Sequence, residues 1–383
     1  MQDIYLTGGA MTVFGRHLGV MAPELAQEAI LKAIEDAGVR IEEIQAIYCA
    51  NVLGGMILGQ LIVRDLGFKG IPVYNVENAC ASGATGVHMA RHALLAQQYD
   101  TVLVFGIEQL TALGGGTIPL QRNDHKTELY ASAGMVLPAV YAMRGTRFLH
   151  ERGASPADLA AVAVKNRYNG SLNEFAQQRT AVTLDEVLGS RMIADPLTLL
   201  QCCAGGDGAG AVIISAVPGE GPAVRFAATA ESAGLDSSGP VDLSRSALTA
   251  SVARRAYERA GLGPEDIDVI ELHDAFTIAE LMYTEALGLC GPGEGPDLIE
   301  SGETALDGRV AVNPSGGLLA RSHPVGATGV AQLAEIFWQL RGQAGRRQTR
   351  PRRVGLTHTT GGGIAGYDHA ACVIHVLIRD QKG

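Results

Sequence analysis

The sequence predicts an α/β protein built from two homologous halves, and three observations lead to this prediction. Short apolar runs alternate with amphipathic segments along the chain, as strands alternate with helices in α/β domains. A helix–turn–strand pattern occurs twice, at an offset of 223 residues. The pentapeptide Gly-Ala-Thr-Gly-Val also occurs twice, in the same order, at an offset of 243 residues. Two repeats in one order at similar offsets indicate a duplication.

The first repeat joins an amphipathic helix to a buried strand. Residues 33–38 and residues 256–261 each end a helical pattern with glycine, the residue that commonly follows a helix C-terminus. A short acidic turn and spaced isoleucines follow each segment, at 44–47 and at 267–270, and they indicate a buried strand.

We divide the chain into an N-terminal half, residues 1–215, and a C-terminal half, residues 220–383. The joint falls in a Pro/Gly stretch, residues 217–222, which suits a linker. Residues from about 111 to 200 have no counterpart in the second half, so we expect an inserted loop domain there. Within it, helices are expected around residues 130–152, 156–168 and 170–178. Strands are expected at Thr101–Phe105, Ala211–Ser215, Val269–Leu272, Val354–Thr357 and Ala371–Leu377.

Composition limits the classes of protein to which the chain can belong. Its 383 residues are 47% hydrophobic and 18% charged, which fits a globular protein with a large core. A net charge of −10 argues against a general nucleic-acid binder, and no apolar run reaches the length of a membrane span. The first residues lack the basic region of a secretory signal and the six cysteines form no C-x-x-C pair. We therefore expect a cytoplasmic protein without a metal site.

The second repeat places a cysteine and a histidine at equivalent positions. Cys80 precedes the first Gly-Ala-Thr-Gly turn, and His323 precedes the second at the same offset of 243 residues. If the halves pack about a pseudo-two-fold axis, the two side chains face one another, which is the pairing that a nucleophilic thiol needs. A free thiol titrates at about 8.5, and the helix that starts after Cys80 is expected to stabilise the thiolate. Cysteine is also a common apolar core residue, a role that we assign to Cys49, Cys203, Cys290 and Cys372.

Two further segments follow predicted strands, where α/β proteins place site residues. His273 follows one of them, although a histidine there fits a core position equally well. Its neighbour Asp274 is expected to cap the helix that starts at Phe276. Gly361-Gly362-Gly363 follows the other strand, and three glycines let backbone N–H groups converge on an oxyanion. Together with the cysteine–histidine pair, these segments supply the nucleophile, base and oxyanion donors of acyl transfer.

These segments resemble the motifs of the thiolase superfamily over essentially the whole chain. Asn78–Gly83 resembles its nucleophile motif, Gly106-Ile107-Glu108 its G-x-E strand end and Asp207-Gly208-Ala209 its D-G-A motif. Residues 313–329 are similar to its block that ends in G-H-P-x-G-A-T-G. The resemblance implies an α/β thiolase fold with five layers, αβαβα, and a loop-domain insertion. It also implies a homodimer or a dimer of dimers.

The resemblance further implies roles for individual residues. Cys80 would be the nucleophile that carries the acyl group, and His323 would activate it and help to hold the thioester oxygen. His273 stands where many thiolases have asparagine and would position an oxyanion-hole water. The backbone N–H groups of Cys80 and Gly361 would form the second oxyanion hole. Coenzyme A would be the co-substrate, with no covalently bound cofactor.

The chain departs from the family pattern at the second catalytic cysteine. Thr359 stands where typical thiolases have this cysteine in C-x-G-G-G, and Ala275 stands where the sterol-carrier-type branch has it in H-D-C-F. His358 is then the nearest titratable candidate for the acid/base role, with a structural histidine as the equal alternative. Ser322 also replaces the usual glycine before His-Pro. The H-D-A-F form resembles an archaeal and bacterial branch that works with a small zinc-ribbon/OB-fold partner protein.

We therefore expect a thiolase-type acyl-CoA C-acyltransferase that makes or cleaves the carbon–carbon bond of a β-ketoacyl-CoA through an acyl-cysteine on Cys80. Two alternatives stay open because the second cysteine is missing: a retro-aldolase acting on a β-hydroxyacyl-CoA, and a non-catalytic subunit of a hetero-complex. The basic run 346–353 is expected to form a loop that is available to a partner. Candidate contacts for the coenzyme A phosphates, with solvated surface charges as the alternative, are Arg122, His125, Lys126, Lys165 and Arg167.

Overall fold

A computed structural model describes residues 2–114, 125–234, 242–362 and 369–380 of the chain. Within these ranges, ten strands form one mixed sheet to which each half of the chain contributes five. The N-terminal strands, in the order β3-β2-β4-β7-β1, are β1 (Tyr5–Met11), β2 (Ala46–Ala50), β3 (Val73–Val76), β4 (Thr101–Gln109) and β7 (Asp207–Ser215). The C-terminal strands, in the order β10-β9-β11-β12-β8, are β8 (Val224–Ala233), β9 (Val269–Glu271), β10 (Ala311–Val312), β11 (Val354–Gly361) and β12 (Ala371–Arg379).

The two half-sheets have the same pairing pattern when they are read outward from the point where they meet. In each, two antiparallel pairs (β1–β7–β4 and β8–β12–β11) are followed by two parallel pairs (β4–β2–β3 and β11–β9–β10). The half-sheets join through a short antiparallel contact, in which Tyr5 pairs with Arg225 and Leu6 pairs with Val224. This matched order is what a duplicated unit produces, and it accounts for the two repeats in the sequence.

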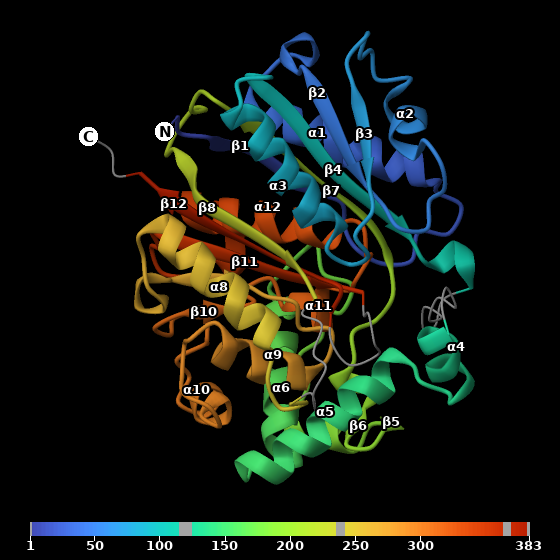
Figure 1. Cartoon of the computed structure of the whole chain (residues 1–383), viewed down its shortest axis with the longest axis vertical. Helices are drawn as coiled ribbons and strands as arrows, with labels where there is room; N and C mark the ends of the chain where they lie inside the picture. The colour runs from blue at the N-terminus through green and yellow to red at the C-terminus, as the bar shows by residue number, and fades with distance from the viewer. Residues whose placement is uncertain (1, 115–124, 235–241, 363–368, 381–383) are drawn as a thin grey trace.

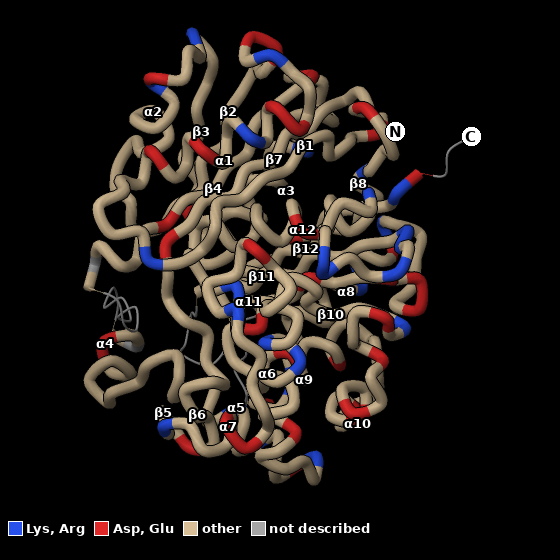
Figure 2. The backbone as a smooth tube through the Cα atoms, turned by 180° about the vertical axis from the view of Figure 1, so that it is seen from behind, with Lys and Arg blue, Asp and Glu red and all other residues tan. Residues whose placement is uncertain are grey.

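Helices cover both faces of each half-sheet and produce five layers. On the outer faces, α1 (Ala22–Ala37) packs on the N-terminal half-sheet and α8 (Ala247–Ala260) packs on the C-terminal one. Between the half-sheets, α3 (Ser82–Leu95) and α12 (Thr328–Arg341) lie side by side, as Figure 1 and the reverse view in Figure 2 show. The order is helix, sheet, helix, sheet, helix, so the predicted αβαβα architecture is confirmed.

Glycines let the two central helices approach each other closely. A Cβ at Gly83 of α3 would lie 2.9 Å from the backbone nitrogen of Val330, and a Cβ at Gly329 of α12 would lie 2.5 Å from that of Ala84. Contacts this short exclude a side chain, so both positions need glycine. The repeated Gly-Ala-Thr-Gly turn therefore brings the N-terminal ends of both helices to the centre of the molecule.

The inserted segment forms a mostly helical region next to the C-terminal half (Figure 1). It contains α4 (His125–Ser132), α5 (Leu137–Arg152), α6 (Pro156–Ser171), α7 (Leu184–Leu188), β5 (Met192–Ala194) and β6 (Leu197–Thr198). The helix expected at 170–178 is wrong, because residues 172–183 contain no helix. There the Asn173 side chain accepts a hydrogen bond from the N–H of Phe175 (3.0 Å) and holds a turn instead. The remaining α-helices are α2 (Leu58–Val63), α9 (Thr277–Ala286), α10 (Gly295–Glu300) and α11 (Gly317–Arg321).

All five predicted strands are present, and four of them are longer than predicted. β11, for example, continues through Thr359 and Thr360 to Gly361, residues that carry a weaker strand signal than the apolar run before them. β1 and β8 are absent from the prediction because their sequences are rich in glycine and alanine. The division of the chain at residues 215–220 falls between β7 and β8 and stays a prediction. None of the helices in the described ranges has the length and hydropathy of a membrane span.

Candidate active site

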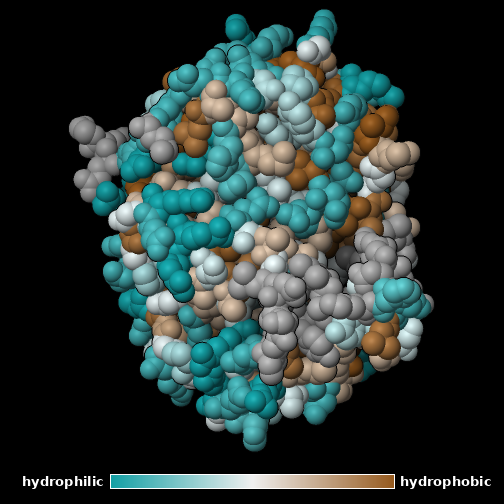
Figure 3. All heavy atoms as spheres, viewed as in Figure 1, coloured by the Kyte–Doolittle hydropathy of each residue, from teal (hydrophilic) through white to brown (hydrophobic). Residues whose placement is uncertain are grey.

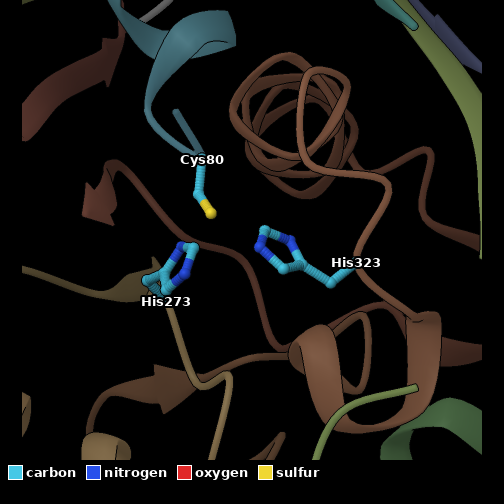
Figure 4. A group of neighbouring side chains, drawn as sticks. All are labelled: Cys80, His273 and His323. Carbon is cyan, nitrogen blue, oxygen red and sulfur yellow. The ribbon is translucent and has the colours of Figure 1, made fainter. Parts of the chain in front are cut away.

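Three side chains from both halves of the chain meet at the N-terminal ends of the central helices. The sulfur of Cys80 and a ring nitrogen from each of His273 and His323 lie within 4.8 Å of one another (Figure 4). The two imidazole rings meet edge to face, with centroids 4.9 Å apart. The structure thus brings together the two residues that the second repeat pairs, and it adds the histidine that follows β9.

A strained turn presents the thiol of Cys80. Ala79 has a φ of 48°, in the left-handed region that residues with a side chain rarely adopt. The Ser82 hydroxyl fixes the turn, because it donates to the Ala79 carbonyl (2.6 Å) and accepts from the N–H of Asn78 (2.8 Å). Gly361, at the end of β11, packs on the same turn so closely that a Cβ there would lie 2.5 Å from the Asn78 carbonyl oxygen. Position 361 therefore needs glycine, because a side chain there would clash with this turn.

Burial, rather than the helix N-terminus, dominates the acidity of the thiol. Desolvation raises the pKa of Cys80 to about 12, against a smaller lowering by the backbone N–H of Gly362. The expectation that the start of α3 stabilises a resting thiolate has no support in this balance. Without a substrate the site holds a neutral thiol, which needs a base before it can attack a carbonyl.

His323 is oriented to be that base. Its Nδ1 lies 2.7 Å from the hydroxyl oxygen of Thr328, and this hydroxyl donates to the carbonyl of Pro324 (3.1 Å). Because the hydroxyl hydrogen is directed to Pro324, we assign the ring hydrogen to Nδ1, which donates it to Thr328. Nε2 is then unprotonated and can accept the thiol proton. Burial, together with the positive charge of Arg321, holds the pKa of His323 well below its usual range, so the ring is neutral.

His273 is buried and neutral, and it has a free polar atom. The side chain is 3% exposed, and desolvation lowers its pKa to about 3. Its Nδ1 is buried without a hydrogen-bond partner among the described residues. This nitrogen is therefore available to a small group bound in the site.

A buried polar network holds the segment that carries His273. The carboxylate of Asp274 accepts from the backbone N–H of Leu318 (2.7 Å) and shares the amide group of Asn166 with Glu280 (2.8 and 2.7 Å). Asp274 therefore caps α11, and the prediction that it caps α9 is wrong. It lies two residues before the N-cap of α9, so its carboxylate reaches the neighbouring helix instead.

Glu108 joins the end of β4 to the segment after His323. Its buried carboxylate accepts from the backbone N–H groups of Val52 (3.0 Å), Leu53 (3.1 Å) and Gly326 (3.2 Å). Desolvation raises the pKa of Glu108 to about 7 despite these three donors. The G-x-E strand end thus fixes the two loops that flank the thiol and its base.

The structure places the backbone N–H of Gly362 against the sulfur of Cys80. This donor lies one residue beyond Gly361, to which the resemblance assigns the second oxyanion hole. That assignment stays a prediction, and Gly363 lies outside the described residues.

His358 does not join the group, so its role as the replacement base has no support in the geometry. Neighbouring residues on a strand point to opposite faces of the sheet. Thr359 points to the central layer, where its hydroxyl donates to Gln332 of α12 (2.6 Å). His358 points to the outer layer, where its Nε2 lies 3.0 Å from the hydroxyl of Thr249 on α8 and its ring packs on Tyr283.

Ser322 occupies a backbone conformation that favours glycine. Its φ is 90° and its ψ is 171°, a region that side chains almost exclude. This backbone conformation explains why glycine suits the position before His-Pro. The serine hydroxyl offsets part of the strain by donating to the carbonyl of Ala204 (3.1 Å).

Two of the five basic residues that were candidates for phosphate contacts lie largely inside the protein. Lys165 forms an ion pair with the buried Glu280 and donates to the Val312 carbonyl (3.0 Å). Arg167 is 7% exposed and donates to the Thr180 carbonyl (3.2 Å). Both are structural. His125 lies exposed at the start of α4, whereas the side chain of Lys126 and the whole of Arg122 lie outside the described residues.

The basic run 346–353 is also partly internal. Arg347 forms a buried ion pair with Glu335 of α12 (2.9 Å) and stacks near Phe175 and Trp338. Arg352 is 2% exposed and donates to three backbone carbonyls, among them that of Gly308 (2.8 Å). These two arginines fasten the segment to the core, so the expectation of an open basic loop is wrong for them.

A polar cluster that the sequence does not indicate lies near the thiol. The hydroxyls of Tyr141 (α5) and Tyr283 (α9) lie 2.9 and 2.8 Å from Nε2 of His369, whose Nδ1 lies 3.1 Å from the Gly362 carbonyl oxygen. Burial raises the pKa of both tyrosines, and the neighbouring Tyr283 raises that of Tyr141 further. Three residues so far apart in sequence form no motif, so only the folded chain reveals them.

Known families and proteins match the chain along nearly its whole length. The family model for the thiolase N-terminal domain matches residues 4–217, and the model for the thiolase C-terminal domain-like family matches residues 233–375. The benzoylsuccinyl-CoA thiolase subunit BbsB of Thauera aromatica is 38% identical over 97% of this chain and 98% of that protein. An acetyl-CoA acetyltransferase of Methanothermobacter thermautotrophicus is 39% identical over 94% of this chain and 97% of that protein.

Solved structures are similar over the full length of the chain. The Ltp2-ChsH2(DUF35) aldolase superposes with a TM-score of 0.86 at 25% identity, covering 100% of this chain and 99% of that one. An acetyl-CoA acetyltransferase from Syntrophomonas wolfei superposes with a TM-score of 0.73 at 18% identity and 100% coverage of both chains, a likeness that concerns the fold alone.

Proposed function

Because the chain belongs to the thiolase family, we propose that it makes or cleaves the carbon–carbon bond of a β-ketoacyl-CoA through an acyl-cysteine on Cys80. The observation that carries this proposal is the meeting of Cys80 with His273 and His323 within 4.8 Å. A thiol beside an oriented imidazole is the arrangement that nucleophilic acyl transfer requires. Coenzyme A is the co-substrate in this proposal.

In the cleavage direction, His323 first removes the thiol proton. Nε2 of His323 takes the proton as the sulfur of Cys80 attacks the β-keto carbonyl, and the carbonyl electron pair moves to oxygen. The N–H of Gly362 and a water positioned by His273 stabilise this oxyanion. The carbon–carbon bond then breaks, and its electron pair leaves with the enolate of the shorter acyl-CoA. The enolate carbon takes the proton from His323.

The acyl group then leaves Cys80 by the reverse chemistry. The thiol of free coenzyme A gives its proton to His323 and attacks the acyl-cysteine carbonyl. Cys80 departs as a thiolate and recovers the proton from the imidazolium. One imidazole thus carries the proton in both halves of the proposed reaction, which then needs no second cysteine at Thr359 or Ala275.

A retro-aldolase is the second candidate, because the solved structure that superposes with a TM-score of 0.86 is that of an aldolase. In this alternative the substrate is a β-hydroxyacyl-CoA. Retention of Cys80 favours the thiolase reaction, since an aldolase needs no acyl-cysteine.

One experiment separates the two candidates. The purified chain is incubated with a panel of β-ketoacyl-CoA and β-hydroxyacyl-CoA esters, with and without free coenzyme A. The proposal predicts cleavage of a β-ketoacyl-CoA that depends on free coenzyme A and is lost in Cys80→Ala. Release of an aldehyde or ketone without coenzyme A, unchanged in Cys80→Ser, would establish the aldolase instead.

We also propose that the chain acts as a homodimer and with a small partner protein. β3 is an edge strand, and the exposed apolar residues around it gather on the face seen at the upper right of Figure 3. Among residues 53–74, the exposed large apolar side chains are those of Leu53, Met56, Ile57, Leu61 and Tyr74. Exposed apolar patches beside an unpaired strand edge favour pairing with a second copy. A zinc-ribbon/OB-fold partner is supported by the relative named as a subunit and by the solved Ltp2-ChsH2(DUF35) aldolase.

A further inference from the structure

We infer that Cys80, His273 and His323 also form a binding site for a thiophilic divalent cation, Zn²⁺ above all, and that the bound cation blocks the nucleophile reversibly. Zinc takes thiolate sulfur and imidazole nitrogen as ligands, and three protein ligands leave one position open. Within the described ranges, this is the one group of three His, Cys, Asp or Glu ligand atoms that gathers closely enough to hold a cation. The inference concerns ligand chemistry and does not depend on the proposed acyl transfer.

The distances allow the three atoms to reach a common metal. Zn–S bonds of about 2.3 Å and Zn–N bonds of about 2.0–2.1 Å place tetrahedral ligand atoms about 3.3–3.6 Å apart. The three atoms here lie within 4.8 Å of one another, so movements of about one ångström bring them to this spacing. Figure 4 shows the sulfur and both rings pointing into one space from three different segments.

Each of the two histidines offers a ring nitrogen whose lone pair no other described group uses. Nδ1 of His273 is buried without a partner in the part of the chain that the structure describes. Thr328 holds the hydrogen of His323 on Nδ1 (2.7 Å), which leaves the lone pair of Nε2 free. Thr328 thereby orients this histidine toward the cation, as partners of metal-bound histidines usually do.

Binding has a defined chemical balance. The thiol of Cys80 loses its proton to solvent, and the sulfur lone pair forms the bond to the cation, without oxidation or reduction. The same lone pair attacks the acyl-CoA, so the cation and the acyl-CoA compete for one atom. The pair of Cys80 and His323 alone offers one sulfur and one nitrogen ligand, and His273 supplies a second nitrogen ligand. An asparagine at position 273 would not supply an imidazole nitrogen.

The test uses Co²⁺ and Zn²⁺ with the full, reduced chain. Co²⁺ is titrated while the thiolate-to-cobalt charge-transfer absorption is followed in the near ultraviolet, and Zn²⁺ is then added to displace it. We expect one equivalent to bind, loss of the band in Cys80→Ala and at least about tenfold weaker binding in His273→Asn. In parallel, Zn²⁺ should protect Cys80 from alkylation by iodoacetamide, and EDTA should restore the alkylation.

The consecutive cysteines Cys202 and Cys203 provide the control for adventitious binding of the cation to other thiols. The double variant Cys202→Ala/Cys203→Ala should keep the band and the protection. Absence of a thiolate band in the unaltered chain, or a band that survives in Cys80→Ala, would overturn the inference. Acylation of Cys80 by an acyl-CoA in metal-free buffer is measured separately, so failure of the metal site and failure of acyl transfer are distinguishable.

Discussion

Replacing Thr328 by valine removes the hydroxyl that fixes the tautomer of His323 and keeps the shape of the side chain. In Thr328→Val, Nδ1–H loses the acceptor that now lies 2.7 Å away. A buried donor without a partner costs about 1–3 kcal/mol. The ring can avoid this cost only by moving its hydrogen to Nε2, which removes the lone pair that accepts the thiol proton.

The same 1–3 kcal/mol, converted at about 1.4 kcal/mol per tenfold, predicts a reaction about 5- to 150-fold slower at Cys80. The assay is the rate at which iodoacetamide alkylates Cys80 at pH 7, followed by peptide mass spectrometry, because it needs no knowledge of the natural substrate. Thr328→Ser keeps the hydroxyl and should react close to the unaltered rate. Equal rates in Thr328→Val and the unaltered chain would refute the role given to this hydroxyl.

Three further predictions follow from particular contacts. Since burial raises the pKa of Cys80 to about 12, its alkylation rate should still be rising above pH 9, and a plateau of the rate below pH 9 would contradict this. The free energy of unfolding should also fall as pH rises from the thiol's unfolded pKa towards its folded pKa, because the neutral thiol is favoured only in the folded state. The free energy of unfolding, measured with denaturant, should be about 1–2 kcal/mol higher for Ser322→Gly than for Ser322→Ala, because a φ of 90° and a ψ of 171° strain any side chain. A more stable alanine variant would contradict the strain argument. Gly361→Ala should destabilise the chain by about 1–3 kcal/mol and slow alkylation of Cys80, because the new Cβ would lie 2.5 Å from the Asn78 carbonyl oxygen; full stability and reactivity would show that the turn yields easily.

The pairing of Cys80 with His323 could be predicted from the sequence because duplication makes it a matter of symmetry. Once two halves repeat, equivalent positions near the axis must face one another, and the Gly-Ala-Thr-Gly turn marks those positions. The architecture follows for the same reason, since each half supplies the same set of strands and helices.

Other parts of the site depend on contacts that no local pattern records. His358 lies next to the position of the missing cysteine in sequence, but strand alternation turns it to the opposite face. Asp274 caps α11 because that helix packs beside it, although α9 is nearer in sequence. The high pKa of Cys80 reflects desolvation of the thiol in the folded chain, which the charge balance of the sequence does not predict.

The measurement that tests the central claim most directly is the mass of the Cys80 peptide after brief exposure of the purified chain to acyl-CoA esters. The account predicts a mass increase equal to one acyl group, on Cys80 alone, that disappears on addition of free coenzyme A and is absent in Cys80→Ala. His323→Ala should form the adduct much more slowly. The claim would be contradicted if the chain turned over an acyl-CoA at an unchanged rate in Cys80→Ala while Cys80 in the unaltered protein never carried an acyl group.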